Sequence, residues 1–73
     1  MGRYFFDLES PQRKQYDYRG RFFESAEYAG QFAELMALDL GIAPDGEWSG
    51  WNICVRDSRG QYLVSVPVQE CGV

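Results

Sequence analysis

The sequence contains no histidine, the side chain that most often exchanges protons near neutral pH. Its two cysteines, Cys54 and Cys71, are too few for a disulfide framework and too isolated for a zinc site, so we expect reduced thiols. Neither cysteine has a neighbour suited to activating it, and no glycine-rich loop leads into the helical segment in a phosphate-binding pattern. We therefore expect a protein that is not an enzyme and that holds no metal or cofactor.

Long apolar runs are also missing from the chain. No stretch approaches the ~20 apolar residues of a membrane span, and the N-terminus lacks a hydrophobic signal segment. These absences predict a soluble, cytoplasmic protein without membrane contacts.

Basic residues are scarce, with seven Lys and Arg against eleven Asp and Glu and a net charge of −4. This balance argues against a general nucleic-acid binder, because affinity for phosphates comes mostly from Lys and Arg. Five of the seven basic residues lie within residues 1–23, so a mildly basic first hairpin precedes an acidic body. Such asymmetry indicates complementarity with a partner or with a second copy.

Apolar and aromatic residues are abundant, at 45% and 16% of the 73 positions. A chain this short buries only about 60% of its unfolded surface, so its core must be rich or shared with a partner. We expect one α+β domain over residues 1–68, followed by a tail over residues 69–73.

One short phrase occurs twice, as Asp17-Tyr18-Arg19-Gly20 and as Asp57-Ser58-Arg59-Gly60. Asp at the first position of a tight turn can accept a bond from the backbone two residues on, and Gly at the fourth tolerates a left-handed backbone. Each phrase is followed by an aromatic-led segment, which predicts a turn before a strand. The repeat therefore indicates two hairpins, one on each side of a helical segment.

The expected elements follow from residue periodicity and capping signals. Strands are predicted over residues 3–8, 14–18, 51–56 and 62–66, and a helix over residues 26–40 with Ser25 as its N-cap and Gly41 at its end. The predicted fold is ββαββ, two β-hairpins joined by one helix that packs on an antiparallel sheet. The first strand is nearly apolar on both faces, which favours a central place in that sheet or a cover on both of its faces.

Two arrangements are open for the second hairpin. A four-residue loop, Asp57–Gly60, sets Val55 opposite Tyr62 and Ile53 opposite Val64, so that the apolar residues share one face. A three-residue loop with a glycine bulge is commoner for this turn chemistry, but it mixes polar and apolar positions on both faces. The face pattern favours the four-residue loop.

Three aspartates precede or lie within these turns. Asp17 and Asp57 are explained by turn chemistry, and Asp7 is expected on the exposed face of the first strand. We do not expect the three carboxylates to converge on a catalytic site.

Several of these motifs resemble a family of short bacterial proteins that is classified only as a domain of unknown function. Its members open with Met-x-Arg-Tyr-Phe-Phe-Asp, carry an Asp-x-x-Gly before an alanine-rich helix, and close with a Val-Arg-Asp-x-x-Gly hairpin. This chain departs from the family after the first strand, where the family has His-Asp-Gly and this chain has Leu8-Glu9-Ser10. The resemblance implies the fold and a bacterial origin, and it supplies no activity. The matching residues are Met1, Arg3, Tyr4, Phe5, Phe6, Asp7, Asp17, Gly20, Ala26, Ala29, Ala33, Val55, Arg56, Asp57 and Gly60.

The predicted helix has a wider apolar arc than a single sheet requires, since packing on a sheet needs only about 100° of its circumference. The surplus is expected to contact a second subunit or a partner, or else to be covered by the loop over residues 42–49. We expect a non-enzymatic protein-interaction module that associates with itself or binds a partner. A homodimer is one form that it can take. Its candidate contact residues are Tyr28, Phe32, Leu35, Leu38 and Trp48.

The alternative function is binding of single-stranded RNA or another nucleic acid through the first hairpin. Basic and aromatic residues alternate there, and exposed aromatics can stack bases while arginine holds phosphates. The acidic body disfavours this alternative. Its candidate residues are Arg13, Lys14, Tyr18, Arg19 and Arg21.

Overall fold

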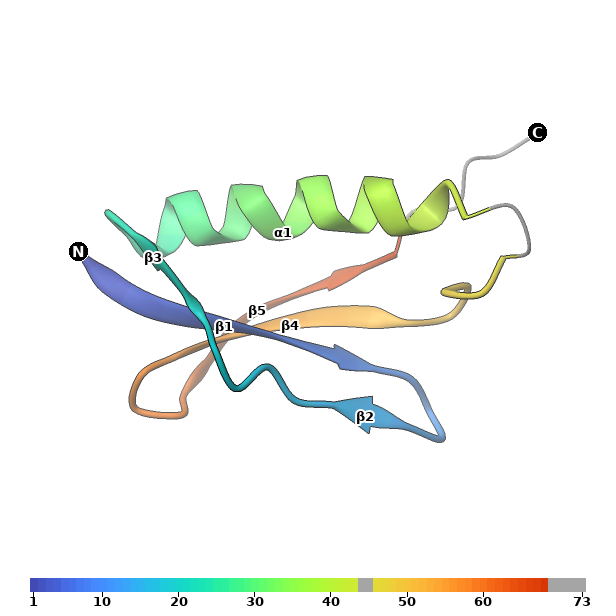
Figure 1. Ribbon diagram of the computed structural model, residues 1–73, viewed down its shortest axis with the longest axis horizontal. Helices are drawn as coiled ribbons and strands as arrows, with labels where there is room; N and C mark the ends of the chain where they lie inside the picture. The colour runs from blue at the N-terminus through green and yellow to red at the C-terminus, as the bar shows by residue number, and fades with distance from the viewer. Residues whose placement is uncertain (44–45, 69–73) are drawn as a thin grey trace.

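The computed structural model describes residues 1–43 and 46–68. The predicted tail over residues 69–73, with Cys71, lies outside the described residues. Five strands form one antiparallel sheet, and a single helix lies along one of its faces (Figure 1). In chain order the elements are β1 (Gly2–Glu9), β2 (Lys14–Gln15), β3 (Arg21–Phe23), α1 (Ala26–Gly41), β4 (Asn52–Asp57) and β5 (Tyr62–Pro67).

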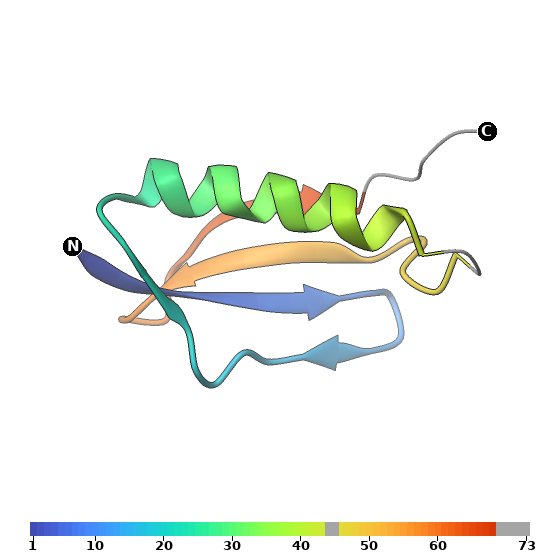
Figure 2. The same cartoon turned by 45° about the horizontal axis from the view of Figure 1, so that its top comes forward.

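The α+β fold with one helix on an antiparallel sheet is confirmed, and β1 is central as predicted. The strand order is β2-β1-β4-β5, and β3 pairs with β1 beyond the end of β2. The predicted second strand over residues 14–18 is shorter than expected, and the chain returns to β1 as β3. Strands β2 and β3 thus share one edge of β1, separated by the segment over residues 16–20 (Figure 2).

The core lies between α1 and the covered face of the sheet. Tyr4, Phe6 and Leu8 face the helix from β1, as the alternation of the strand predicts. Three alanines on one side of α1 are fully buried and let the helix approach the sheet closely. The buried cluster is Phe6, Ala29, Ala33, Ala37, Ile53 and Val55.

Helix α1 begins and ends close to the predicted positions. The Ser25 hydroxyl accepts a bond from the Tyr28 N–H at 3.4 Å, which confirms it as the N-cap. The helix ends at Gly41, one residue beyond the predicted range, and the Ile42 N–H donates to the Asp39 carbonyl at 3.2 Å. No helix within the described residues is long and apolar enough to cross a membrane.

The predicted register of the second hairpin is wrong, because the loop has three residues. The Asp57 N–H donates to the Gln61 carbonyl at 2.9 Å, the Asp57 carboxylate accepts the Gln61 N–H at 2.9 Å, and Gly60 adopts a left-handed backbone with φ of +86°. The pairing then shifts between Val55 and Arg56, which leaves Leu63 as an extra residue in β5.

This shift determines which face of the sheet each side chain of β5 occupies. Ile53 pairs with Val66 and Val55 with Val64, so apolar residues still share the helix-facing side. Tyr62 pairs with Arg56 instead, and it therefore lies on the opposite face of the sheet. The three-residue loop and the extra residue together retain the apolar face that seemed to require a four-residue loop.

One helix is narrower than this sheet. An α-helix with its side chains is about 10 Å across, which matches about two strands at their usual spacing of about 4.8 Å. Helix α1 packs mainly over β4 and β5, and it makes fewer contacts with β1 and β3. Helix α1 makes no contact with β2, so the helix-facing side of the sheet beside β2 lies outside the area that α1 covers (Figure 2).

Candidate functional site

The Asp7 carboxylate is the centre of a polar cluster on the sheet face opposite the helix. It is completely buried, so the prediction that Asp7 is exposed is wrong. Arg56 Nε donates to Asp7 Oδ2 at 2.7 Å, and the Tyr62 hydroxyl donates to the same oxygen at 2.9 Å. The alternation of β1 correctly places Asp7 on the face away from the helix, but neighbouring side chains cover it there.

Asp17 completes this cluster and also forms the predicted turn. Its Oδ1 accepts bonds from the Arg19 and Gly20 N–H groups at 3.0 and 3.1 Å. Its Oδ2 accepts the Phe6 N–H at 3.1 Å, while its own N–H donates to Asp7 Oδ1 at 2.9 Å. This reciprocal pair of bonds fixes the segment between β2 and β3 against β1.

Gly20 allows the backbone of this turn to lie close against β1. Its φ is +72°, and an added Cβ would lie 2.9 Å from Cε1 of Phe5. A side chain at this position would therefore push the turn away from β1.

The two carboxylates are held in their charged forms. Burial alone would raise the pKa of Asp7, but the bonds from Arg56, the Asp17 N–H and Tyr62 outweigh it and lower that pKa. The pKa of Asp17 is lowered in the same way, against the effect of burial, by its three backbone donors. The bond to Asp7 raises the pKa of Arg56, whose guanidinium also lies 4.5 Å from the centre of the Phe5 ring.

This cluster has the properties of a structural centre. Asp57 does not join it, because its carboxylate accepts the Arg59 and Gln61 N–H groups within the β4–β5 turn. Within residues 1–43 and 46–68, every buried side-chain nitrogen and oxygen has a hydrogen-bond partner. The same part of the chain contains no group of three or more Cys, Asp or Glu side chains placed to hold a metal ion. Cys54 is a free, buried thiol whose Sγ lies 3.8 Å from the Ser65 hydroxyl.

Three of the five candidate contact residues lie together on the outside of α1. Tyr28, Leu35 and Leu38 are 53%, 64% and 53% exposed, and we refer to these three as the outer helix surface. The described part of the loop over residues 42–49 leaves them exposed, so it does not cover the helix as the other interpretation required.

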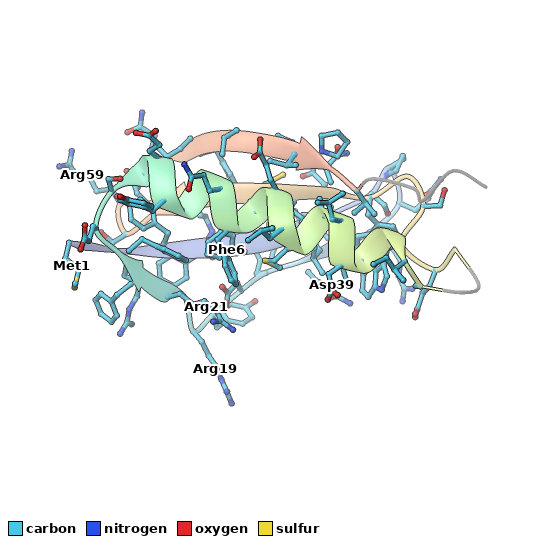
Figure 3. All side chains as sticks on the ribbon, turned by 90° about the horizontal axis from the view of Figure 1, so that it is seen from above. Met1, Phe6, Arg19, Arg21, Asp39 and Arg59 are labelled. Carbon is cyan, nitrogen blue, oxygen red and sulfur yellow. The ribbon has the colours of Figure 1, made fainter. Side chains whose placement is uncertain are left out.

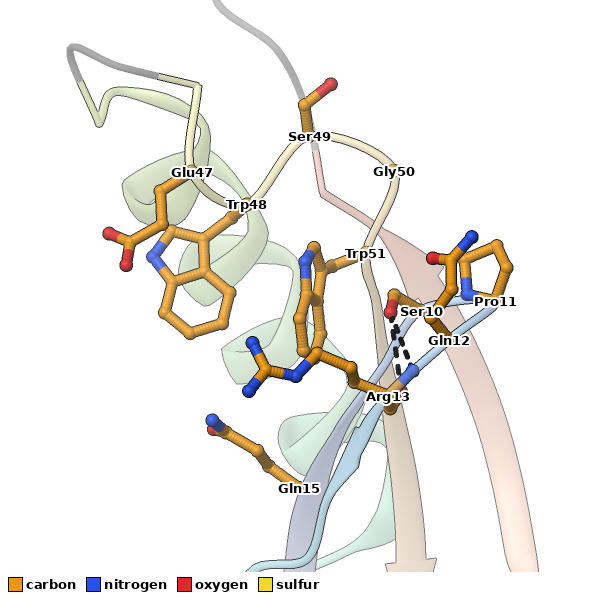
Figure 4. Close-up of a pocket in the computed structure, with 10 residues that line it drawn as sticks. All are labelled: Ser10, Pro11, Gln12, Arg13, Gln15, Glu47, Trp48, Ser49, Gly50 and Trp51. Carbon is orange, nitrogen blue, oxygen red and sulfur yellow. Dashed lines mark hydrogen bonds between the residues drawn. The ribbon is translucent and has the colours of Figure 1, made fainter.

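Phe32 and Trp48 lie elsewhere. Phe32 is half-buried in the core, with its ring centre 5.3 Å from that of Phe6 and 5.4 Å from that of Phe23. Trp48 packs edge-on against Trp51 at 5.2 Å, beyond the far end of the sheet. This pair and Arg13 line a hollow of about 340 Å³ (Figure 4).

Apolar residues from other elements extend the outer helix surface on both sides. On one side, Tyr28 and Leu35 share a shallow hollow of about 500 Å³ with Met1, Phe22 and Phe23. On the other side, Leu38 lines a hollow of about 420 Å³ with β5, the outer strand of the sheet. Sequence reasoning missed these neighbours because it did not establish the strand order.

The candidate nucleic-acid residues do not form one surface. Lys14 pairs with Glu9 at 3.2 Å on the face away from the helix, and Arg13 lies at the Trp48 hollow. Arg21 lies on the helix side, 4.9 Å from the centre of the Phe32 ring. Tyr18 is 83% exposed, and Arg19 extends away from the body of the domain (Figure 3).

No curated protein and no solved structure matches the chain. A family model described as a domain of unknown function, DUF6894, matches residues 3–69, which agrees with the resemblance to an uncharacterised family. The chain belongs to this DUF6894 family.

Proposed function

We propose that this domain is a non-enzymatic protein-interaction module that binds a second copy of itself or a partner protein through the outer helix surface. The observation that supports the proposal is the exposure of Tyr28, Leu35 and Leu38 on a helix of 16 residues. Ala29 and Ala33 already supply the contact with the sheet, so the core does not require these three large side chains.

The extent of the apolar surface strengthens this interpretation. A single exposed leucine is ordinary in a soluble domain, but adjoining apolar patches are typical of interaction sites. Here the outer helix surface continues into the hollow at Phe22 on one side and into the hollow at Val64 on the other. Aromatic and aliphatic side chains of this kind are the usual anchors of protein interfaces.

Charge favours association between copies. The exposed acids Glu27 and Glu34 lie beside the outer helix surface, and α1 has no basic residue in its last turn. The first hairpin carries most of the basic residues of the chain. An acidic rim on one copy and a basic hairpin on another would attract each other during encounter.

The nucleic-acid alternative receives less support from the geometry. Its five candidate residues do not share one surface, and one of them, Lys14, is partly neutralised by Glu9. We expect no measurable binding of single-stranded RNA at physiological salt, which a fluorescence anisotropy titration would test.

The variant Leu35→Glu tests the proposed function. The side chain is 64% exposed, so the substitution should leave the fold and the helical circular dichroism unchanged. A buried, unpaired carboxylate would be costly at an interface, so the assembly should dissociate. Ser58→Glu, which adds the same charge to the exposed β4–β5 turn, is the matched control. Sedimentation velocity measures the masses, and an unchanged mass for Leu35→Glu would refute the proposal.

A further inference from the structure

The uncovered flank of the sheet forms a groove between α1 and the segment that joins β2 to β3. The groove is about 700 Å³ in volume, within the range of about 300–1,000 Å³ that is usual for small-molecule sites. It exists because α1 packs mainly over β4 and β5, while β2 and β3 extend the sheet on the other side of β1. Figure 3 shows this flank from above, with Arg19 and Arg21 on the side of the helix opposite β5.

The floor and the helix wall of the groove are apolar. Phe6 and Leu8 lie on the floor, and Phe32 and Met36 form the wall on α1. Phe6 is buried, with 6% of its surface exposed, and the other three side chains keep a larger part of their surface open to the groove. An apolar body would gain free energy by covering them, at about 25 cal/mol per Å² of apolar surface removed from water.

The opposite wall carries positive charge. Arg19 and Arg21 line the groove, and neither has a carboxylate within ion-pairing distance among the residues that the structure describes. The nearby Asp17 carboxylate is occupied by three backbone N–H donors. The guanidinium of Arg21 lies 4.9 Å from the centre of the Phe32 ring, between the charged wall and the apolar wall.

Asp39 places a negative charge at the end of the groove that lies away from the arginines. It is the acidic residue of α1 that lines the groove, and it lies toward the C-terminal end of α1, away from the arginines (Figure 3). Like charges repel, so an acidic group would be favoured at the arginine end and disfavoured beside Asp39. The charges therefore complement a ligand that is acidic at one end and apolar at the other.

We propose that this groove binds a small amphipathic anion, with its apolar body against Phe32 and Met36 and its acidic group on Arg21, assisted by Arg19. Guanidinium groups bind carboxylates in a planar, two-point geometry, and such charge-assisted bonds are stronger than neutral ones. A protein with a net charge of −4 would otherwise repel anions, so the two arginines select the ligand and its orientation.

A nuclear magnetic resonance titration of the full chain with 1-naphthoate tests this proposal. The matched neutral probe is 1-naphthalenemethanol, which keeps the aromatic body and lacks the charge. We expect naphthoate to shift the backbone amides of residues 15–21 and 32–39, and to bind about tenfold more tightly than the alcohol, a difference of about 1.4 kcal/mol.

Variants identify the charged groups that hold the probe. Arg21→Gln should weaken naphthoate binding about tenfold and leave the alcohol unaffected, since it removes one charge-assisted contact. Arg59→Gln, at the distant β4–β5 turn, is the matched control and should change neither affinity (Figure 3). If Arg21→Gln perturbs the packing of Phe32, Arg19→Gln takes its place, because Arg19 is exposed and extends into solvent.

Four results would overturn the proposal: no shifts with naphthoate at millimolar concentration, shifts confined to the outer helix surface, equal binding of both probes, or no effect of either arginine substitution. None of the substituted residues belongs to the outer helix surface. The naphthoate titration and the sedimentation of Leu35→Glu therefore test the groove and the proposed function separately.

Discussion

Asp7 connects four segments of the chain through a single carboxylate. It lies on β1 and accepts bonds from the turn at Asp17, from Arg56 on β4 and from Tyr62 on β5. The sequence predicted an exposed Asp7 because strand alternation separates faces but does not reveal which side chains meet on a face. Arg56 is 49 residues away in the chain, and Tyr62 reaches this face only because the register shifts beside it.

The substitution Asp7→Asn should destabilise the domain by about 3 kcal/mol, since it leaves the half-buried Arg56 without its charged partner. Tyr62→Phe removes one donor to the same carboxylate and should cost about 1.5 kcal/mol. Urea unfolding followed by tryptophan fluorescence measures both losses. Equal stability of Asp7→Asn and the wild type would show that the cluster does not support the fold.

Stability should depend on pH in the acid range because the pKa values of Asp7 and Asp17 are lowered in the folded state. Both carboxylates have higher pKa values in the unfolded chain, about 3.9, so the unfolded state takes up protons first as the pH falls. Their contribution is complete above about pH 5, decreases as the pH falls through the unfolded value, and is lost once the pH passes the lowered folded values.

Urea unfolding at a series of pH values between neutral and strongly acidic measures this dependence. The free energy of unfolding should fall below about pH 5 in the wild type and fall less steeply in Asp7→Asn. Identical slopes for the two proteins would contradict the lowered pKa of Asp7.

At the scale of secondary structure elements, local signals were sufficient for α1 and β1. Ser25, the alanine spacing and Gly41 predict the helix to within one residue, and apolar alternation predicts which face of β1 is buried. Local signals were not sufficient for the second hairpin, because two loop lengths are compatible with the same alternation of apolar and polar residues. A four-residue loop does so directly, and a three-residue loop does so once Leu63 is added as an extra residue.

Strand β3 shows a similar limit. Its three residues, Arg21–Phe23, are too few to show a period, and its pairing depends on the bonds of Asp17 to the backbone of Phe6 and Gly20. Phe32 was expected on the surface because β3 was not predicted. Strand β3 brings the ring of Phe23 against the ring of Phe32. The outward positions of Tyr28, Leu35 and Leu38 follow from helical geometry alone, and those were predicted.

Two glycine substitutions should change stability in opposite directions. Gly30→Ala in α1 adds a Cβ that meets no atom within 4 Å, so better helix propensity should stabilise the domain by about 0.5–1 kcal/mol. Gly60→Ala also meets no atom within 4 Å, but its φ of +86° should make it destabilising by about 1–2 kcal/mol. Thermal unfolding measures both changes: the melting temperature should rise for Gly30→Ala and fall for Gly60→Ala. Shifts of the same sign would contradict the role assigned to Gly60 in the hairpin turn.

At the scale of the whole molecule, the mismatch between one helix and a sheet four strands wide determines where surface remains for other molecules. The side of the sheet beside β2 holds the groove with Arg21, and on the other side of α1 the outer helix surface meets β5 at Leu38. The length of the chain predicted a core that is rich in apolar residues or shared with a partner. It did not locate these surfaces, because their positions depend on the strand order.

We propose that another protein chain covers the outer helix surface in the cell. Native mass spectrometry of the protein, purified gently from the organism that makes it, tests this most directly, with Leu35→Glu expressed in the same organism as the comparison. We predict a dimer or a complex with a partner for the wild type, and a single chain for the variant. A wild-type protein that remains a single chain at its cellular concentration would contradict the account.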